Sequence, residues 1–432
     1  MMHLIGVINW GSELELDNLN TMVNLINKSI FSLLFTSTFF FNGCKEAELL
    51  GYDQVINPVW EYNYNVGLTR VIQPIIDEEL VIYASASEKK NDLSANQKLI
   101  ALDKENGKVE WEWEDHFSSS FQNFKAHSLK PIFNGRVALT IGGRNFCIDL
   151  ITGETIWKNI NENSTSNSEL KSIGNILYRT DISVDDYHER IMEADFSTGK
   201  WKPVYEVNGG DSIRQGLQVP AFYFEPDGDT IMVFSNTLWD NTTNKIIPRL
   251  ISYNKTQDST YYDIQLDDDP DVYSAVDWFP EIYGDRIYLS VDDHMVCCDL
   301  YTGEIIWRSY MQANNLASNF LIIDGSIYIH VEGDGILWCF DAEDGSMIWR
   351  KQSKGNPSFL NYYEGKLIYV AGGKLWITDA NDGATLATIT APSAYKNPDA
   401  FFSPDCTVDP ETGNIFVTSW TTAYCYPPYE KE

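Results

Sequence analysis

An acidic run in the middle of the chain is the first candidate for chemistry. Residues 265–271 read Gln-Leu-Asp-Asp-Asp-Pro-Asp, and clustered carboxylate oxygens are the ligands that Ca²⁺ takes. The spacing is not that of an EF-hand loop, and a solvated loop explains the same residues. We therefore predict no metal site, with Ca²⁺ as the alternative at Asp267, Asp268 and Asp269.

Cysteines are the second candidates, as metal ligands or as disulfide partners. Cys147, Cys297 and Cys339 each stand two residues before an Asp that recurs along the chain, where Ala101 occupies the same place. The position therefore favours a small buried residue, and the sequence predicts structural cysteines rather than metal ligands. Cys297 and Cys298 would point to opposite faces of a strand, so we do not expect a disulfide between them.

Nothing in the chain predicts a catalytic site. The six His residues are scattered, and neither a nucleophile elbow nor a phosphate-binding loop occurs. Cys406 and Cys425 both fall near the C-terminus, where an oxidising compartment would permit a disulfide, and the sequence leaves their pairing open. We predict no catalytic residues.

The N-terminal region predicts export and a lipid anchor. An apolar run, Ile30 to Phe41, follows Lys28 and precedes Gly43-Cys44, an order that resembles a bacterial lipoprotein signal. We predict a signal peptide over residues 1–43, a lipid on Cys44 and a tether over 44–51; an uncleaved anchor or a buried helix is the alternative. Three acidic residues upstream suggest that Met22 is the true start and that 1–21 extend the gene model.

One pattern recurs along the rest of the chain: an Asp, two residues, a polar residue with Gly, three residues and a Trp. Its Asp residues are Asp103, Asp149, Asp195, Asp299, Asp341 and Asp379, and a degenerate copy lies at Tyr253-Asn254-Lys255. Successive copies are 46, 46, 42 and 38 positions apart outside the wide central gap. A period near 40–45 is typical of propellers or helical arrays.

Local composition selects the propeller. The segments 287–291, 327–331 and 367–370 are β-branched and aromatic, with tight Gly turns before them. Each unit therefore predicts a blade of four antiparallel strands, and counting gives an all-β, eight-bladed propeller. Val59 to Tyr62 has no blade of its own, so we expect this N-terminal strand to complete the last blade and close the ring.

The Asp-to-Trp pattern resembles the PQQ-like, or tryptophan-docking, propeller family over residues 52–428. The resemblance implies that certain tryptophans dock each blade on the next, namely Trp60, Trp111, Trp157, Trp307 and Trp349. Quinone enzymes of the family carry inserted segments for cofactor and calcium, which this lean chain lacks, so we expect no PQQ. Lipidated propellers of this size resemble the scaffold lipoprotein of the outer-membrane barrel-assembly machinery.

Connection lengths divide the propeller into two faces. Turns between first and second strands and between third and fourth strands are short, and we call their side the short-turn face. The other connections open on the loop-rich face and include long segments such as 85–97, 181–189, 209–219, 236–248 and 266–277. Long loops on a rigid scaffold often carry binding, so we predict a binding face there with Tyr187, Trp239, Asp267, Asp268, Asp269, Tyr273 and Trp278.

Composition limits the partners. A net charge of −31 opposes binding to nucleic acid and to anionic lipid. We expect a non-enzymatic binding or assembly scaffold at the outer membrane, anchored by its lipid, with a protein partner at the membrane or a glycan. The alternatives are a surface-exposed glycan- or protein-binding component and, after it, a quinone- or metal-dependent enzyme.

Overall fold

A computed structural model describes the propeller and its turns. It covers residues 53–64, 73–86, 97–114, 131–141, 144–159, 164–165, 170–183, 188–208, 213–243, 245–267, 276, 279–311, 317–331, 335–354, 358–392, 401–419 and 421–430. Gln54–Glu432 forms one compact unit. No helix within these ranges is long and apolar enough to cross a membrane.

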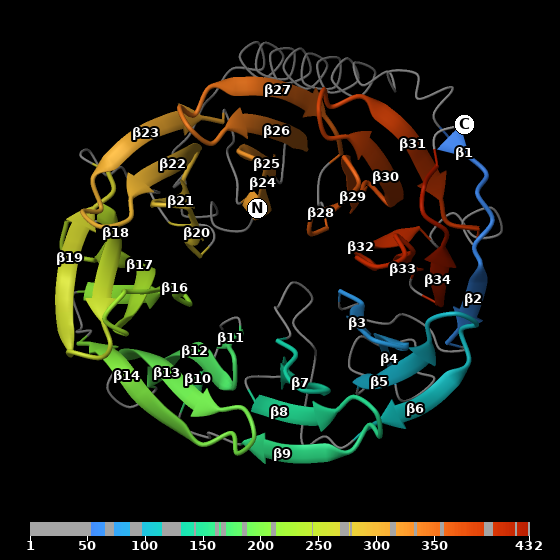
Figure 1. The fold of residues 1–432 in the computed structure, drawn as a ribbon, viewed down its shortest axis with the longest axis horizontal. Helices are drawn as coiled ribbons and strands as arrows, with labels where there is room; N and C mark the ends of the chain where they lie inside the picture. Colours follow the sequence, from blue (N-terminus) through green and yellow to red (C-terminus); the bar gives the residue numbers. More distant parts are fainter. Residues whose placement is uncertain are drawn as a thin grey trace, which may run out of the picture. The chain divides into compact units, whose positions relative to one another are not determined.

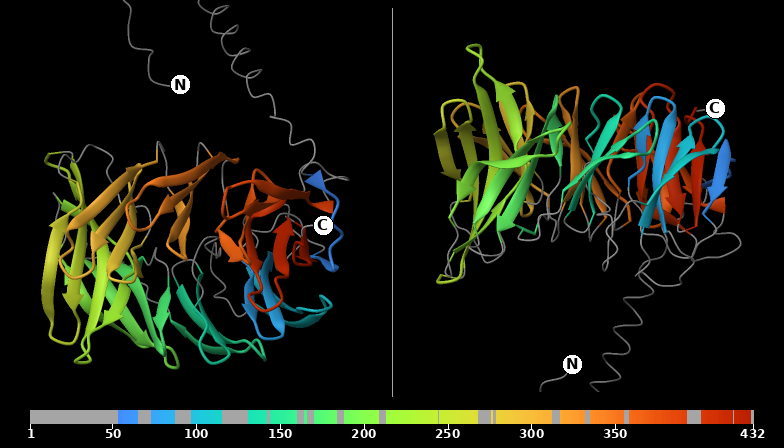
Figure 2. Two further views of the ribbon diagram at one scale, coloured as in Figure 1. Left: turned by 45° about the horizontal axis from the view of Figure 1, so that its top comes forward. Right: turned by 90° about the horizontal axis from the view of Figure 1, so that it is seen from below.

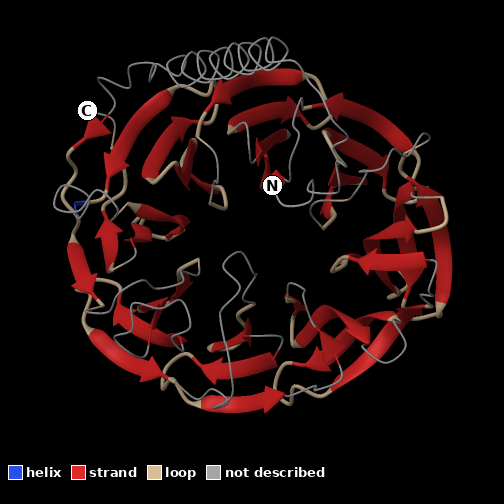
Figure 3. Ribbon diagram, turned by 180° about the vertical axis from the view of Figure 1, so that it is seen from behind, coloured by secondary structure: helices blue, strands red, loops and turns tan. Residues whose placement is uncertain are grey.

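Eight antiparallel sheets follow one another around a ring (Figure 1), and strands make up nearly all of its regular structure (Figure 3). The edge-on view on the right of Figure 2 shows the blades side by side in a single layer. The all-β, eight-bladed prediction is confirmed. Each sheet is numbered here from the first blade to the eighth, with its first strand nearest the centre.

The first four blades have these strands. The first contains β3 (Ile75–Asp77), β4 (Leu80–Ala86), β5 (Gln97–Asp103) and β6 (Val109–Trp113). The second contains β7 (Arg136–Ile141), β8 (Arg144–Asp149) and β9 (Thr155–Asn159). The third contains β10 (Ser164–Thr165), β11 (Lys171–Ile173), β12 (Ile176–Ser183), β13 (Glu189–Asp195) and β14 (Trp201–Val207). The fourth contains β15 (Ile213–Leu217), β16 (Ala221–Phe224), β17 (Thr230–Asp240), β18 (Lys245–Asn254) and β19 (Ser259–Gln265).

The last four blades complete the ring. The fifth contains β20 (Glu281–Tyr283), β21 (Arg286–Val291), β22 (His294–Asp299) and β23 (Ile305–Tyr310). The sixth contains β24 (Ala317–Ile323), β25 (Ser326–Val331), β26 (Ile336–Asp341) and β27 (Met347–Gln352). The seventh contains β28 (Asn361–Tyr363), β29 (Lys366–Ala371), β30 (Lys374–Asp379), β31 (Thr385–Thr390) and β1 (Asp53–Gln54). The eighth contains β32 (Phe402–Val408), β33 (Ile415–Ser419), β34 (Thr422–Tyr426) and β2 (Trp60–Asn63).

The ring closes by joining the two ends of the propeller, as predicted. β2 pairs antiparallel with β34, and Trp60 lies opposite Cys425. Figure 1 shows the blue β2 beside the red β34. Across the seam to the first blade, Lys104 Nζ lies 3.0 Å from Asp409 Oδ2. β2 thus covers the outer edge of β34, which would otherwise be exposed and invite aggregation.

The recurrent Asp builds the turn between third and fourth strands. Asp299 Oδ1 accepts the backbone N–H groups of Tyr301 at 3.0 Å and Thr302 at 2.8 Å. Gly303 then adopts φ of +75° and donates its N–H to the Asp299 carbonyl at 2.9 Å. Glycine takes this left-handed conformation without a Cβ penalty, which explains the Asp-x-x-x-Gly pattern.

Cysteines fill the space between blades as free thiols. Cys297 packs in the cluster with Tyr288 and Phe340, whereas Cys298 packs in the cluster with Val296 and Leu300. The adjacent cysteines therefore serve opposite faces of β22, as the strand geometry requires. Cys406 and Cys425 are free as well, and burial raises the pKa of each thiol to about 12.

Two segments expected to be connections contain strands. Within 236–248, β17 runs on to Asp240 and β18 begins at Lys245, so only a short tip remains. Within 209–219, β15 pairs with the distal part of β17, with Gly216 opposite Thr237. The sequence interpretation of these two segments as loops was wrong.

Candidate binding surfaces

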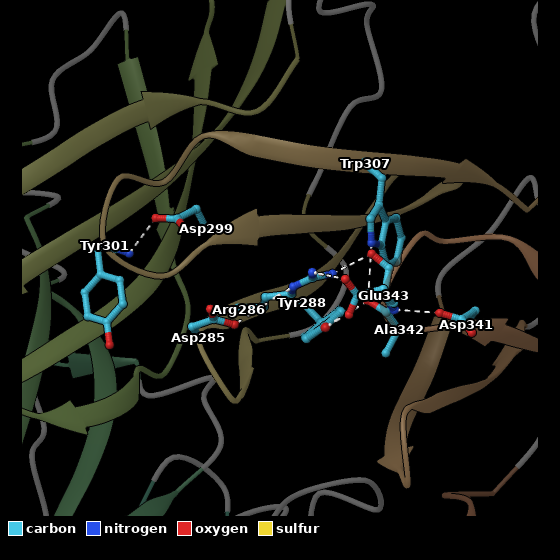
Figure 4. A network of polar contacts seen from close by, with 9 residues as sticks. All are labelled: Asp285, Arg286, Tyr288, Asp299, Tyr301, Trp307, Asp341, Ala342 and Glu343. Atoms are coloured by element: carbon cyan, nitrogen blue, oxygen red, sulfur yellow. Dashed lines mark hydrogen bonds and ion pairs between the residues drawn. The ribbon is translucent and has the colours of Figure 1, made fainter.

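The contact between the fifth and sixth blades shows how docking works (Figure 4). The carbonyl of Ala342, just after the repeat Asp of the sixth blade, accepts Trp307 Nε1–H at 3.3 Å and Tyr288 O–H at 3.0 Å. Arg286 Nη1 donates to the same carbonyl at 3.2 Å, and its Nη2 bonds Glu343 Oε1 at 2.9 Å. Three donors from one blade thus hold a single turn of the next.

Glycine in the docked turn makes room for the indole. A Cβ added at Gly345 would lie 2.5 Å from the ring of Trp307, and Gly345 has φ of +73°. Two separate constraints therefore act at this position: the left-handed backbone and the ring that covers it. The turn and the tryptophan are two halves of one joint.

The other four expected docking tryptophans make the same contact. In each case the indole N–H reaches the carbonyl that follows the next blade's repeat Asp, at 2.9, 2.9, 2.8 and 3.1 Å for Trp60, Trp111, Trp157 and Trp349. Their rings cover Gly107, Gly153, Gly199 and Gly383. At the fourth blade Tyr262 replaces the tryptophan, covering Gly303 and donating its O–H to Leu300 at 3.2 Å. These aromatic side chains therefore serve the packing of one blade on the next.

The joint between the third and fourth blades is built differently. Asp258 takes the glycine position with φ of +53°. Lys255, which follows the position of the repeat Asp, sends its ammonium back to Glu193 and to the hydroxyl of Tyr178, the latter at 3.0 Å. Tyr205 packs edge-on against Tyr253, with ring centroids 5.1 Å apart. An ion pair and tyrosines here replace the tryptophan-glycine joint.

Trp239, from the predicted binding face, lies on an extension of the fourth blade. We call this feature the blade-4 extension: β15, residues 236–240 of β17 and residues 245–249 of β18. β17 has 11 residues, whereas its counterparts in the fifth, sixth and seventh blades have six. A Cβ at Gly216 would lie 2.4 Å from Trp239, so the indole lies across β15. The extension fixes Trp239 within its own blade.

Apolar side chains accompany Trp239 along the extension. Ile246 pairs with Trp239 across the two strands, and Leu238 pairs with Ile247. All four are only partly buried. Cross-strand partners project on the same face, so Trp239 and Ile246 share one face, while Leu238 and Ile247 share the other.

Polar contacts brace the base of the extension. Asn236 Nδ2 donates to Gln215 Oε1 at 2.7 Å. Glu189 of the third blade accepts the N–H of Leu217 at 2.7 Å. Burial raises the pKa of Glu189 from 4.5 to about 7, against the lowering effect of the Leu217 N–H. The carboxyl group thus ties β15 to the third blade while being costly to ionise.

Asp267 is the second predicted binding residue that the structure describes. It follows β19, and its Oδ1 lies 3.9 Å from Arg308 Nη1 of the fifth blade. Arg308 also donates to the carbonyl of Leu266. The remaining predicted residues, Tyr187, Asp268, Asp269, Tyr273 and Trp278, lie outside the described residues, as do Cys44 and the expected signal peptide.

A cavity of about 330 Å³ opens beside the first strands of the fifth and sixth blades. Phe279, Phe320 and Phe359 line it together with Glu281. Lys171, from the third blade, approaches Glu281 to 3.5 Å and lies 3.8 Å from the ring centroid of Phe279. The Glu281 charge is thereby paired within the propeller.

Comparison with known proteins supports the same architecture. A family model described as "Outer membrane protein assembly factor BamB" matches residues 47–203 and 236–414. No curated protein sequence gives a significant match. BamB from Moraxella catarrhalis superposes with a TM-score of 0.57 at 11% identity, covering 88% of this chain and 99% of that one.

Two further solved structures show how widely the architecture is shared. Quinohemoprotein alcohol dehydrogenase from Comamonas testosteroni gives a TM-score of 0.60 at 10% identity, covering 87% of this chain and 78% of that one. Sqt1 from Saccharomyces cerevisiae gives 0.60 at 9% identity, covering 87% and 100%. At such identities the likeness concerns the fold alone. The family match, by contrast, spans well over half of the sequence, and with its repeat, its joints and its eight blades the chain belongs to the PQQ-like propeller family of the outer membrane protein assembly factor BamB.

Proposed function

We propose that the protein is a non-enzymatic scaffold that binds a protein partner at the outer membrane, with the blade-4 extension as its principal contact. The observation that carries this proposal is the partly exposed Trp239, fixed on Gly216 beside Ile246. The five repeat tryptophans dock one blade on the next, whereas Trp239 lies outside the repeat and packs on Gly216 of its own blade.

The extension suits a protein partner better than a small ligand. It adds rows of apolar side chains beyond the blade, and a tryptophan held in one orientation loses little entropy on binding. The free edge of β18 in the extension is short, because the carbonyl of Pro248 already accepts the N–H of Leu266 at 2.8 Å. Pro248 has no N–H to offer a further strand. We therefore assign recognition to side chains rather than to strand addition.

The membrane anchor is part of the same proposal. Family membership and the Gly43-Cys44 sequence after an apolar run support a lipid on Cys44. Cys44→Ala should abolish acyl labelling and release the protein from the membrane fraction. Retention of the wild-type chain in membranes without acylation would overturn this part of the proposal and leave the binding surface untouched.

Co-purification from native membranes tests the binding surface. The tagged full chain should retain a stoichiometric membrane-protein partner, and Trp239→Ala with Ile246→Ala should lose it. A well-packed aromatic anchor contributes about 2 kcal/mol or more to affinity. Met347→Ala, at an exposed position on the rim of the sixth blade, is the matched control and should retain the partner.

Two outcomes would contradict the assignment. Equal recovery of the partner by the double variant and the parent would exclude the extension as the contact. Saturable oxidation of an alcohol or sugar by the purified chain with PQQ and Ca²⁺ would favour the enzyme interpretation instead. Circular dichroism and thermal melting of each variant establish that the propeller remains folded.

A further inference from the structure

The short-turn face carries an aromatic and acidic patch that the loop-length argument did not anticipate. We define the aromatic-acid patch as Glu225, Asp227, Tyr261 and Tyr301. Its two aromatic side chains are 41% and 60% exposed for Tyr261 and Tyr301. Exposed aromatic clusters on a stable scaffold commonly mark contact sites.

Contacts between neighbouring elements bring the patch together. Tyr301 lies in the turn after β22, and its ring meets that of Tyr223 edge-on with centroids 6.0 Å apart. Tyr261 on β19 donates its O–H to Glu225 Oε2 at 3.3 Å. The patch therefore spans the boundary between the fourth and fifth blades.

Propeller architecture does not require these aromatic residues. The turn at Tyr301 is held through backbone N–H groups bonded to Asp299, and other blades carry Glu105, Ser197 or Glu343 at the same position. Figure 4 shows Tyr301 lying apart from the Ala342 joint. An aromatic side chain is therefore not needed to build this turn.

Charge decides what would cover the patch. Carboxylate oxygens of Glu225, Asp227 and Asp229 lie within 4.8 Å of one another. The amides of Asn254 and Gln257 donate to Asp229 at 2.7 and 2.6 Å, whereas the ion pairs among the described residues of this blade involve Arg249 and Lys255 and not Glu225 or Asp227. Clustered carboxylates beside aromatic faces favour a cation, through ion pairing and cation–π attraction together.

We propose that the aromatic-acid patch binds an arginine-bearing segment of a partner protein, on the face opposite the blade-4 extension. A planar guanidinium can pair with Glu225 or Asp227 while it lies on an aromatic ring. The scaffold would then hold two partners at once, one on each face of the ring. This second site is independent of the first, because no residue is shared between them.

Fluorescence anisotropy with a labelled nonapeptide of alternating Gly and Arg tests the proposal on the folded propeller. Tyr301→Ala and the Glu225→Gln/Asp227→Asn double variant should each raise its Kd about tenfold or more. Replacing Arg by citrulline in the probe removes the charge and keeps the shape. This probe should bind the parent protein with a Kd raised by a similar factor. Added salt should weaken binding to the parent more than to the carboxylate variant.

Controls exclude general attraction to an acidic protein. Ile151→Ala and Glu154→Gln change the same type of turn on the second blade, where Ile151 is exposed, and should leave the Kd unchanged. Patch variants that bind like the parent, or second-blade controls that lose as much affinity, would overturn the proposal. Equal binding of the citrulline probe would also overturn it, because the guanidinium charge would then have no role.

Discussion

Two blade boundaries hold the same ring together by different physics. Between the fifth and sixth blades, the ring of Trp307 lies on Gly345 and its N–H bonds Ala342. Between the third and fourth blades, Lys255 pairs with Glu193, and tyrosines fill the space. The first boundary depends mainly on shape and on hydrogen bonds to one carbonyl, with an ion pair to the exposed Glu343 at its margin, whereas the second depends on an ion pair to the buried Glu193. A propeller therefore tolerates loss of its repeat motif at one joint if a different contact replaces both the docking tryptophan and the glycine turn that it covers.

The largest expected difference concerns the glycine of the joint. Gly345→Val should destabilise the propeller by about 4 kcal/mol or more, because it combines a left-handed backbone with a ring 2.5 Å from the new Cβ. Asp258→Gly, at the matching position of the fourth blade, should change stability by less than about 1 kcal/mol. Urea unfolding followed by tryptophan fluorescence measures both, and comparable losses would show that the joints are equivalent.

Removing the indole should come next in size. Trp307→Leu leaves a gap over Gly345 and removes one of three donors to Ala342, so we expect about 3 kcal/mol of destabilisation. Tyr288 and Arg286 still satisfy the carbonyl, so no buried acceptor is orphaned. The loss should be the same in low and high salt. A strong salt dependence would contradict a joint based on packing.

The charged joint should respond to both salt and pH. Lys255→Met should cost about 2 kcal/mol at pH 7, with Glu193 keeping Lys202 at 3.0 Å. Burial would raise the pKa of Glu193, but hydrogen bonds from Lys255 and Lys202 hold it below 4.5. A lowered pKa gives stability that is present above 4.5 and lost as pH falls through the folded-state pKa. The difference between parent and variant should therefore shrink as the pH falls below 4.5.

The smallest expected effect has the opposite pH dependence. Glu189 at the same boundary has its pKa raised by burial to about 7, so its stabilising contribution is full below pH 4.5 and is lost as pH rises through 7. Glu189→Gln keeps an oxygen for Leu217 N–H and removes the charge. It should stabilise the propeller by about 1 kcal/mol at pH 8 and leave it unchanged at pH 4.5. Identical pH profiles for the two proteins would show that Glu189 is ionised at no cost.

The repeat made the fold predictable, because the first, second, fifth and sixth blades carry the same Asp, Gly and Trp in the same order. The closing strand was also predictable, since Trp60 occupied a docking position in a segment that lacked a blade. β15 and the extended hairpin were missed for local reasons. Gly216 weakens a strand pattern, yet it is required under Trp239. Pro248 suggests a loop, yet here it lies near a strand edge, where its missing N–H costs nothing.

The candidate sites were less accessible to sequence reasoning. Trp239 was singled out because it fell in a long segment expected to be a loop on the loop-rich face, whereas the segment is a hairpin of β17 and β18. The aromatic-acid patch was missed because short turns were assumed to have only structural duties. Tyr301 shows why this fails: backbone N–H groups make the turn, which frees the side chain at that position to vary. Exposure, which distinguishes Tyr301 from a packed tyrosine, depends on neighbours far away in the chain.

Closure by β2 has a consequence for the order of assembly. A ribosome releases Trp60 near the beginning and Tyr424 near the end, so the first strand of the ring must wait unpaired while seven blades form. Blades can fold locally and early, but the seam joins the most distant contacts in the chain and pays its loop-closure entropy last. Folding should therefore show a slow final step. A chain truncated before β34 should remain an open array of blades, because β2 then has no strand to pair with.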